Sequence, residues 1–209
     1  MKQDIQQKAL ALVLLTGALW LLLDQVTKYL AVAHLTTLLD PADPWLERVR
    51  IFMMTDNLHP LATAPVPVVK GLWEHVYVQN DAAAFGLLSS LPLGARRAVL
   101  ILVAVGASVA LPYYGWRMAA LHGRIPWLGR LVQICLGLVL GGAVGNVLDR
   151  SLHGYVIDFI HWHYKSYSWP PFNIADTGIV VGVFTLVVFL GRAEAEPEGA
   201  AKAKEKGKK

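Results

Sequence analysis

The stretch LVQICLGLVLGGAVGNVLDR, residues 131–150, decides how this chain folds. It carries no charge until it ends in an aspartate and an arginine, Asp149 and Arg150. A helix needs about 20 apolar residues to cross the hydrocarbon core of a bilayer. We therefore expect a membrane-spanning helix whose polar residues gather at one end.

Three further segments of the 209-residue chain are nearly free of charge over a similar length. The sequence therefore predicts an all-α polytopic membrane protein with four transmembrane helices and a small periplasmic cradle of β and irregular structure. The helices are expected at about 9–33, 95–116, 129–150 and 174–192, the cradle at 34–94, the whole membrane domain at 1–193, and a disordered cytoplasmic tail at 194–209.

The composition agrees with this fold class. Hydrophobic residues make up 55% of the chain and charged residues 16%, with a mean hydropathy of +0.45. That is too apolar for a disordered chain and too poor in charge for an ordinary soluble domain. The net charge is +4, but the basic residues do not gather on one face, so no nucleic-acid partner is expected. Cys135 is the only cysteine, which excludes an internal disulfide.

The basic residues also predict the orientation. Eleven of the 19 lysines and arginines lie near the N-terminus, in the connection after residue 116, or in the tail. Cytoplasmic loops carry the excess of positive charge. With four spans both termini lie on one side, so we expect both in the cytoplasm.

The long connection between the first two spans contains five of the 11 prolines, so long helices are not expected there. Residues 73–78 alternate well enough to form a strand that ends at Asn80. Glycines 141, 142 and 145 predict close packing between helices near the polar end of the third span.

One polar spacing occurs twice. Asn146 and Asp149 end the third span, and Asn173 and Asp176 begin the fourth. Antiparallel helices would bring the two pairs to the same depth, where neighbouring carboxylates share a proton as in aspartic proteases. One would take a proton from water while the other polarises a carbonyl. The alternative is that the asparagines cap helix ends and the acids pair with cations.

Other functions stay open at this point. Asp24 and Lys28 lie one helical turn apart and are expected to form a salt bridge. The segment His161-Trp162-His163 raises the alternative of a metal site, with His161, Asp149, Asp158 and Asp176 as its ligands. An aromatic belt at the lipid headgroups explains the same segment equally well. A small proton- or ion-handling transporter could use the intramembrane acids as a relay. The acids of such a relay would be Asp24, Asp149, Asp158 and Asp176.

Five blocks in this order resemble the lipoprotein signal peptidases, or signal peptidases II, of bacteria. The resemblance covers most of residues 9–191. The blocks are Asp24-Gln25-x-Thr27-Lys28, Asn80-x-x-Ala83-Ala84-Phe85-Gly86, Gly141-Gly142-Ala143-x-Gly145-Asn146-x-x-Asp149-Arg150, Val156-x-Asp158-Phe159 and Phe172-Asn173-x-Ala175-Asp176.

The resemblance implies a globomycin-sensitive aspartic endopeptidase of the inner membrane, working without a cofactor or metal near the periplasmic face. Its substrates would be prolipoproteins with a diacylglyceryl-modified cysteine, cut on the amino side of that cysteine, and we expect it to act in membrane lipid as a monomer. By motif, the catalytic residues are Asp149 and Asp176, and the pocket residues are Asp24, Lys28, Asn80, Asn146, Arg150, Asp158 and Asn173.

The chain departs from the family pattern in two places. Ala82 stands where the family usually has glycine, so the backbone after Asn80 either follows a different path or keeps a negative φ at this position. The segment 29–79 is also longer than expected for the family. It could add a lid or an outer contact, or be an insertion without function.

Overall fold

The computed structural model describes residues 2–41, 43–54, 60–81, 90–119 and 125–189. Three helices in this part are long and apolar enough to cross a membrane, namely α1 (Lys2–Leu35), α3 (Leu93–Arg117) and α5 (Pro126–Leu152). The last helix, Ile174–Phe189, is apolar but shorter. The predicted count of four transmembrane helices is therefore supported for three, and residues 190–192 of the fourth lie outside the described part.

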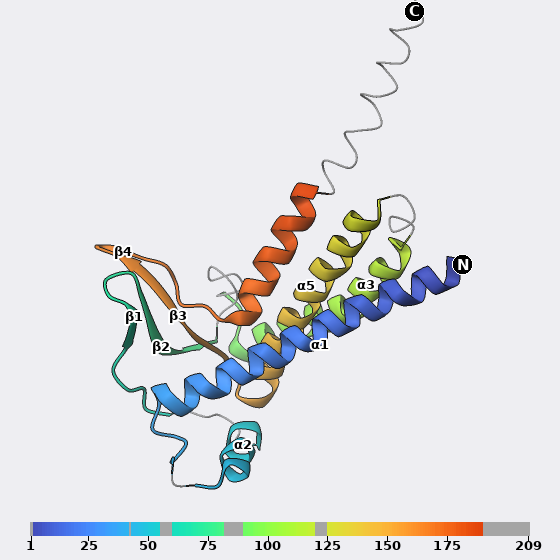
Figure 1. The fold of residues 1–209 in the computed structure, drawn as a ribbon. Coiled ribbons are helices and arrows are strands. Elements are labelled where there is room, and N and C mark those ends of the chain that lie inside the picture. Colours follow the sequence, from blue (N-terminus) through green and yellow to red (C-terminus); the bar gives the residue numbers. More distant parts are fainter. Residues whose placement is uncertain (1, 42, 55–59, 82–89, 120–124, 190–209) are drawn as a thin grey trace, which may run out of the picture.

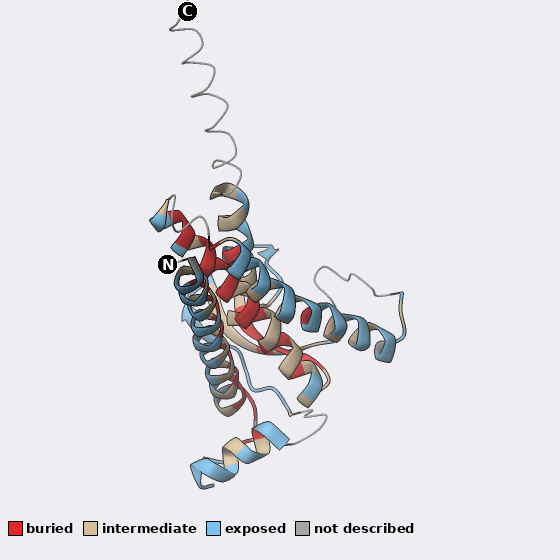
Figure 2. Ribbon diagram, turned by 90° about the vertical axis from the view of Figure 1, so that its right-hand side faces the viewer, coloured by how far each residue is buried: buried red, intermediate tan, exposed pale blue. Residues whose placement is uncertain are grey.

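The helices lie side by side, with α5 packed between α1 and α3 (Figure 1). Large apolar side chains on the outer faces of α1, α3 and the last helix are exposed, as Figure 2 shows, while the buried residues gather along α5. Exposed leucines such as Leu15 and Leu19 fit a surface in contact with lipid, where burial against protein is not needed.

Glycines let these helices approach closely. A Cβ atom on Gly141 would lie 2.5 Å from the carbonyl oxygen of Gly17 in α1. A Cβ on Gly142 would meet the carbonyl oxygen of Ala175 in the last helix, and one on Gly145 would meet the carboxylate of Asp24. The close packing predicted from this glycine run is confirmed.

A four-stranded antiparallel sheet in the order β1-β2-β3-β4 stands beside the helices. Its strands are β1 (Val66–Val69), β2 (Trp73–Asn80), β3 (Val156–Tyr164) and β4 (Tyr167–Ser168). The predicted strand ending at Asn80 is confirmed as β2. Between α1 and β1, the described residues form one short helix, α2 (Trp45–Met54). This agrees with the expectation that the proline-rich segment lacks long helices.

The sheet and the helices meet where α5 ends. Gly154 turns the chain from α5 into β3 with a φ of +89°. Glycine adopts this positive φ at little energetic cost because it has no Cβ atom. A buried apolar cluster that includes Val32, Phe52 and Ile157 joins α1, α2 and β3 there. The junction therefore holds the start of β3 against the ends of α1 and α5.

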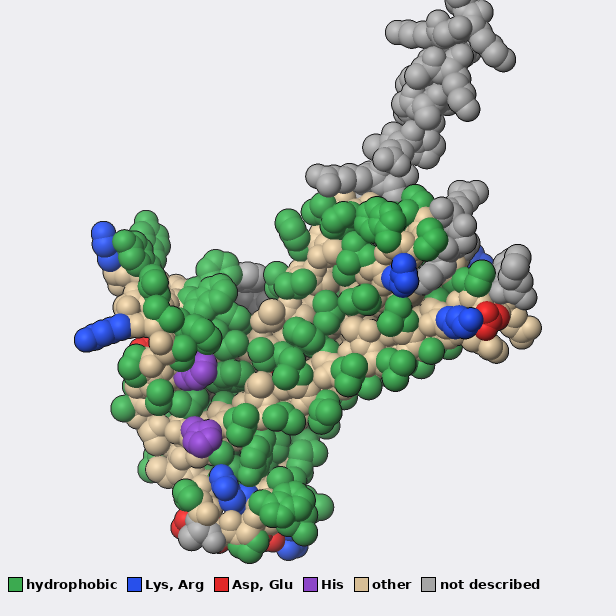
Figure 3. Space-filling view, viewed as in Figure 1, with side chains coloured by type: hydrophobic (Ala, Val, Ile, Leu, Met, Phe, Trp, Pro, Cys, Tyr) green, Lys and Arg blue, Asp and Glu red, His purple; other side chains and the backbone are tan. Residues whose placement is uncertain are grey.

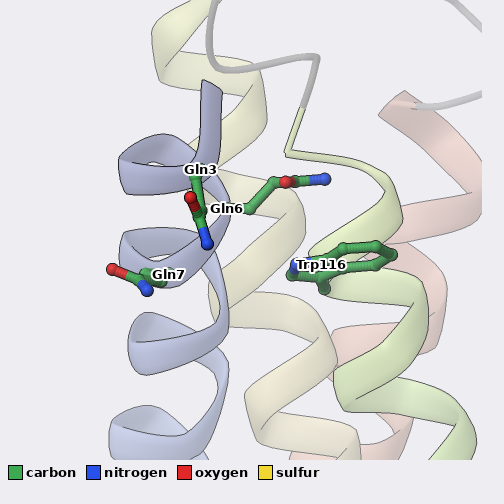
Figure 4. Close-up of a pocket in the computed structure, with 4 residues that line it drawn as sticks. All are labelled: Gln3, Gln6, Gln7 and Trp116. Carbon is green, nitrogen blue, oxygen red and sulfur yellow. The ribbon is translucent and has the colours of Figure 1, made fainter. Parts of the chain in front are cut away.

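The opposite end of the bundle has a pocket of about 500 Å³ between the start of α1 and the end of α3 (Figure 4). It is lined by Gln3, Gln6, Gln7 and Trp116. None of these side chains ionises in the physiological range, so the pocket lacks the acid–base groups that the sequence predicts for the active site.

Candidate active site

The polar residues predicted from the sequence converge where the helices meet the sheet. Five elements contribute to the cluster, and most of its side chains are buried. Its members are Asp24 and Lys28 on α1, Asn80 on β2, Asn146, Asp149 and Arg150 on α5, Asp158 on β3, and Asn173 and Asp176 at the start of the last helix.

Lys28 is the centre of the buried ionic part of the cluster. Its Nζ atom lies 2.8 Å from Oδ2 of Asp24 and 2.8 Å from Oδ2 of Asp149, and all three side chains are fully buried. Nζ also donates a hydrogen bond to Oδ1 of Asn146 at 3.2 Å. The predicted salt bridge between Asp24 and Lys28 is confirmed, and Asp149 shares the same cation.

The carboxylate of Asp149 also accepts two hydrogen bonds. Its Oδ1 accepts a hydrogen bond from Nε2 of Gln25 at 3.0 Å, and its Oδ2 accepts one from the backbone N–H of Ile157 at 3.1 Å. Gln25 was absent from the predicted site residues, although it stands beside Asp24 in the first sequence block. With a buried cation and two other donors, Asp149 connects α1, α5 and β3.

The two N-x-x-D pairs do meet, as their spacing predicted. Asn146 donates a hydrogen bond from Nδ2 to Oδ1 of Asp176 at 2.8 Å, and Asn173 donates one from Nδ2 to Oδ1 of Asn146 at 3.2 Å. The contacts between the pairs run through the asparagines, so Asn146 links the Lys28–Asp149 ion pair to Asp176.

Asn173 also caps the last helix. Its Oδ1 accepts the backbone N–H of Asp176 at 2.9 Å, and Oδ2 of Asp176 accepts the backbone N–H of Asn173 at 3.2 Å. This reciprocal pair has the form of a capping box. For Asn173 the capping alternative is therefore correct, together with the predicted convergence of the two motifs.

Asp158 is the carboxylate most closely linked to Asp176. Nδ2 of Asn173 donates to Oδ1 of Asp158 at 2.7 Å, while the backbone N–H of the same Asn173 donates to Asp176. On its other oxygen Asp158 accepts a hydrogen bond from Nδ2 of Asn80 at 2.8 Å. Burial, reinforced by the negative charge of Asp176, raises the pKa of Asp158 to about 7.

The three aspartates thus have different surroundings. Asp149 is paired with a cation, whereas in the described part of the chain no salt bridge reaches Asp158 or Asp176. Asp158 is buried and Asp176 is half-buried. Asp149 therefore differs from Asp158 and Asp176 in being held by the ammonium group of Lys28.

Arg150 lies in the last turn of α5 and donates from Nη1 to the carbonyl oxygen of Asn146 at 3.1 Å. Its half-buried guanidinium interacts electrostatically with all three aspartates, most strongly with Asp176. Residues 82–89, which include Ala82 and the rest of the second sequence block, lie outside the described part of the chain.

The histidines of the metal alternative lie away from this cluster, on β3. Nδ1 of His161 lies 2.9 Å from Oε1 of Glu74, and Nε2 of His163 lies 3.9 Å from Oε2 of the same residue. Among the described residues, no group of three or more histidine, cysteine, aspartate or glutamate side chains is arranged to hold a metal ion.

Fold and site together define a multi-pass membrane protein with a buried network of carboxylates and amides at one end of its helices. A family model described as Signal peptidase (SPase) II matches residues 16–191. The chain belongs to the signal peptidase II family. It is thus a bacterial membrane protease that cleaves signal peptides, and nothing in the comparisons supports the transporter alternative.

Curated relatives agree. A lipoprotein signal peptidase of Anaeromyxobacter sp. (strain Fw109-5) is 41% identical over 186 residues, which is 87% of this chain and 85% of the relative. One of Syntrophus aciditrophicus (strain SB) is 36% identical over 182 residues, covering 87% and 93%. A solved bacterial membrane enzyme at 2.3 Å resolution, 24% identical, has the same fold with a TM-score of 0.60 over 88% of this chain and 90% of that one.

Proposed function

We propose that this peptidase cleaves prolipoproteins on the amino side of a diacylglyceryl-modified cysteine, and that Asp158 and Asp176 form its catalytic pair. The substrate class follows from the family and from relatives named lipoprotein signal peptidase. The pair differs from Asp149 and Asp176, which the motif spacing predicted. That earlier prediction stays the competing one.

A single observation carries the assignment. Asn173 donates hydrogen bonds to both Asp158 and Asp176, one from its side chain and one from its backbone. One residue thus holds two carboxylates, and neither of them forms a salt bridge within the described part of the chain. Two such groups in a site of low dielectric constant cannot both ionise easily, so one keeps a proton. Burial and the charge of Asp176 raise the pKa of Asp158 to about 7, which supports Asp158 as the partner that keeps the proton.

In the proposed reaction, half-buried Asp176 accepts a proton from a water molecule as the water oxygen attacks the scissile carbonyl carbon. Asp158 donates its proton to the carbonyl oxygen, which forms a tetrahedral diol. Asp176 then returns a proton to the amide nitrogen of the modified cysteine. The C–N bond breaks, Asp158 regains its proton from the diol, and the products are a carboxylic acid and a free amine.

The neighbouring residues position this pair. Asn80 and Asn173 hold Asp158, and Asn146 holds Asp176. Lys28 keeps Asn146 in place through its hydrogen bond to Oδ1. Arg150, half-buried beside the aspartates, is suited to bind a backbone carbonyl of the substrate.

Lipid supplies part of the substrate affinity. Each buried CH₂ of an acyl chain contributes about 0.8 kcal/mol, and the chains can stay in the bilayer while the peptide bond reaches the carboxylates. We further propose the orientation that the basic residues predict. Both termini lie in the cytoplasm, and the site lies near the periplasmic face of the inner membrane. Residues 1–193 form one membrane domain, which acts as a monomer without nucleic acid or cofactor.

The test compares three isosteric variants, Asp149→Asn, Asp158→Asn and Asp176→Asn, in purified protein. Each receives the same precursor with and without the diacylglyceryl group, and folding is checked by thermal unfolding. We expect the unvaried protein to cut only the modified precursor. Asp158→Asn and Asp176→Asn should lose cleavage at least a thousandfold while remaining folded, and Asp149→Asn should retain measurable cleavage.

The outcomes separate the two pairs. Full loss in a folded Asp149→Asn protein, together with activity in Asp158→Asn, would return the catalytic role to Asp149. Equal cleavage of both precursors would contradict the proposed substrate class.

A further inference from the structure

The free end of the sheet has a surface that peptide-bond cleavage does not explain. We call this surface the sheet tip. It consists of the turn between β1 and β2, the turn between β3 and β4, and the aromatic residues around them. Its members are Val69, Lys70, Leu72, Trp162, Tyr164, Lys165, Tyr167 and Trp169.

Large aromatic side chains of the sheet tip are exposed. Trp162 is 52% exposed, Tyr164 56%, Tyr167 81% and Trp169 58%. With Leu72 and Trp73 they line an open groove of about 480 Å³. A patch of this kind on one small sheet marks an interaction site, because isolated exposed apolar residues are common but clusters of aromatics are not.

Two lysines stand in the turns of the sheet tip. Lys70 lies between β1 and β2, and Lys165 lies between β3 and β4, where its Nζ is 5.3 Å from the centre of the Tyr164 ring. Within the described part of the chain, neither lysine has a salt bridge, although Glu74 on β2 pairs with His161 nearby. The sheet tip therefore carries two positive charges among aromatic groups, a combination that suits an anionic partner.

The sheet tip points along the side of the helices. Figure 1 shows the sheet leaving the active-site end of the bundle sideways, with its free end away from the helices, while α2 lies beyond the end of α1. Figure 3 shows basic side chains among hydrophobic ones on this free end. If the helices cross a bilayer, the sheet extends over its surface.

We propose that the sheet tip binds the headgroup region of the phospholipid bilayer that holds the helices, with anionic phospholipid as its preferred contact. Tryptophan and tyrosine favour this interface because their rings are apolar and their N–H or O–H groups reach water. Lysines near an anionic surface are attracted to it. The same bilayer surrounds the exposed apolar faces of α1 and α3, so the sheet tip continues that contact outside the hydrocarbon core.

The test measures membrane depth and needs no enzymatic activity, so its failure is distinct from failure of the proposed function. In a Cys135→Ala background, Tyr167→Cys places a nitroxide label on the sheet tip, and Glu47→Cys places a matched control on the exposed surface of α2. Full-length protein is reconstituted in nanodiscs of phosphatidylcholine with or without phosphatidylglycerol. Collision rates are measured with oxygen, which concentrates in lipid, and with a water-soluble nickel chelate.

We expect the label at position 167 to collide more with oxygen and less with the nickel chelate than the label at 47. Replacing both lysines, Lys70→Glu and Lys165→Glu, should shift the label at 167 toward the nickel chelate, and should do so only where phosphatidylglycerol is present. Unchanged thermal unfolding would exclude misfolding, since all these positions are exposed.

Three results would contradict the proposal in whole or in part. A label at 167 that is as accessible to nickel as the label at 47 would mean that the sheet tip stands in water. A label protected from both reagents would mean that protein covers it, a second copy of the chain in this purified system. A lysine effect of equal size in both lipid compositions would remove the preference for anionic lipid.

Discussion

The ammonium group of Lys28 lies 2.8 Å from the carboxylate of Asp149, and neither side chain has any exposed surface. An equal contact links Lys28 to Asp24 on its own helix. One cation therefore holds two carboxylates from two helices, at the place where the site is assembled. Removing a partner from a buried ion pair is costly because it leaves a charge in a site of low dielectric constant.

Lys28→Met should destabilise the protein most, by about 3–5 kcal/mol, because it leaves two buried carboxylates together. Asp149→Asn should cost less, since Asp24 still pairs with Lys28. The double variant should cost less than the sum of the single ones, with a coupling of about 0.5–3 kcal/mol. Thermal unfolding in detergent measures this cycle. The exposed pair of Asp4 and Lys8, with the same spacing, is the control and should show almost no coupling.

The raised pKa of Asp158 predicts a pH limit to activity. Because its proton is needed, kcat/KM should fall as pH rises through about 7. The hydrogen bond from Asn80 lowers this pKa, so Asn80→Ala should move the falling limb to higher pH, whatever it does to substrate binding. A pH profile of cleavage checks both statements. A limb that stays in place in Asn80→Ala would contradict the role of Asp158.

The active site should require the close approach of α5 and the last helix at Gly142. Its Cβ would meet the carbonyl oxygen of Ala175, one residue before Asp176, and backbone cannot move aside as a flexible side chain can. Gly142→Ala should therefore destabilise the protein by about 1–3 kcal/mol and reduce cleavage. Gly106→Ala on α3 is the matched control, because among the described residues nothing outside its own stretch of helix lies within 4 Å of a Cβ there. Equal effects of the two variants on the thermal midpoint would contradict this account.

Inhibitors should distinguish a carboxylate mechanism from a metal-dependent one. Water activated by Asp176 needs no Lewis acid, so EDTA should leave the cleavage rate unchanged, and globomycin should inhibit as the family resemblance implies. Loss of cleavage in EDTA that added zinc restores would favour the metal alternative. Metal analysis of the purified protein provides an independent check.

Much of the architecture could be predicted because its signals are local. Long segments with few or no charged residues indicated α1, α3 and α5. The alternation of side chains indicated β2 up to Asn80. The glycine run at 141–145 predicted close helix packing, because small residues have the same consequence in any bundle. The repeated N-x-x-D spacing predicted that Asn146 and Asp176 would lie near each other, and they are hydrogen-bonded.

The residues that contact Asp149 and Asp158 could not be predicted from the sequence, because they come from other helices and strands. On α5, the spacing of Asn146 and Asp149 indicates a shared helical face, but it does not say that both contact Lys28 or that Asn146 also reaches Asp176. Nor does the block around Asp158 reveal that β3 returns this residue to Asn173.

The sequence by itself determined that this is a multi-pass membrane protein with its acids gathered in a few motifs, because hydropathy and spacing act along the chain. Only the tertiary structure decided that Asp149 pairs with Lys28 and that Asp158 and Asp176 share Asn173. The physical reason is that the free energy of a buried carboxylate depends on which charges and donors other elements bring within a few ångströms of it.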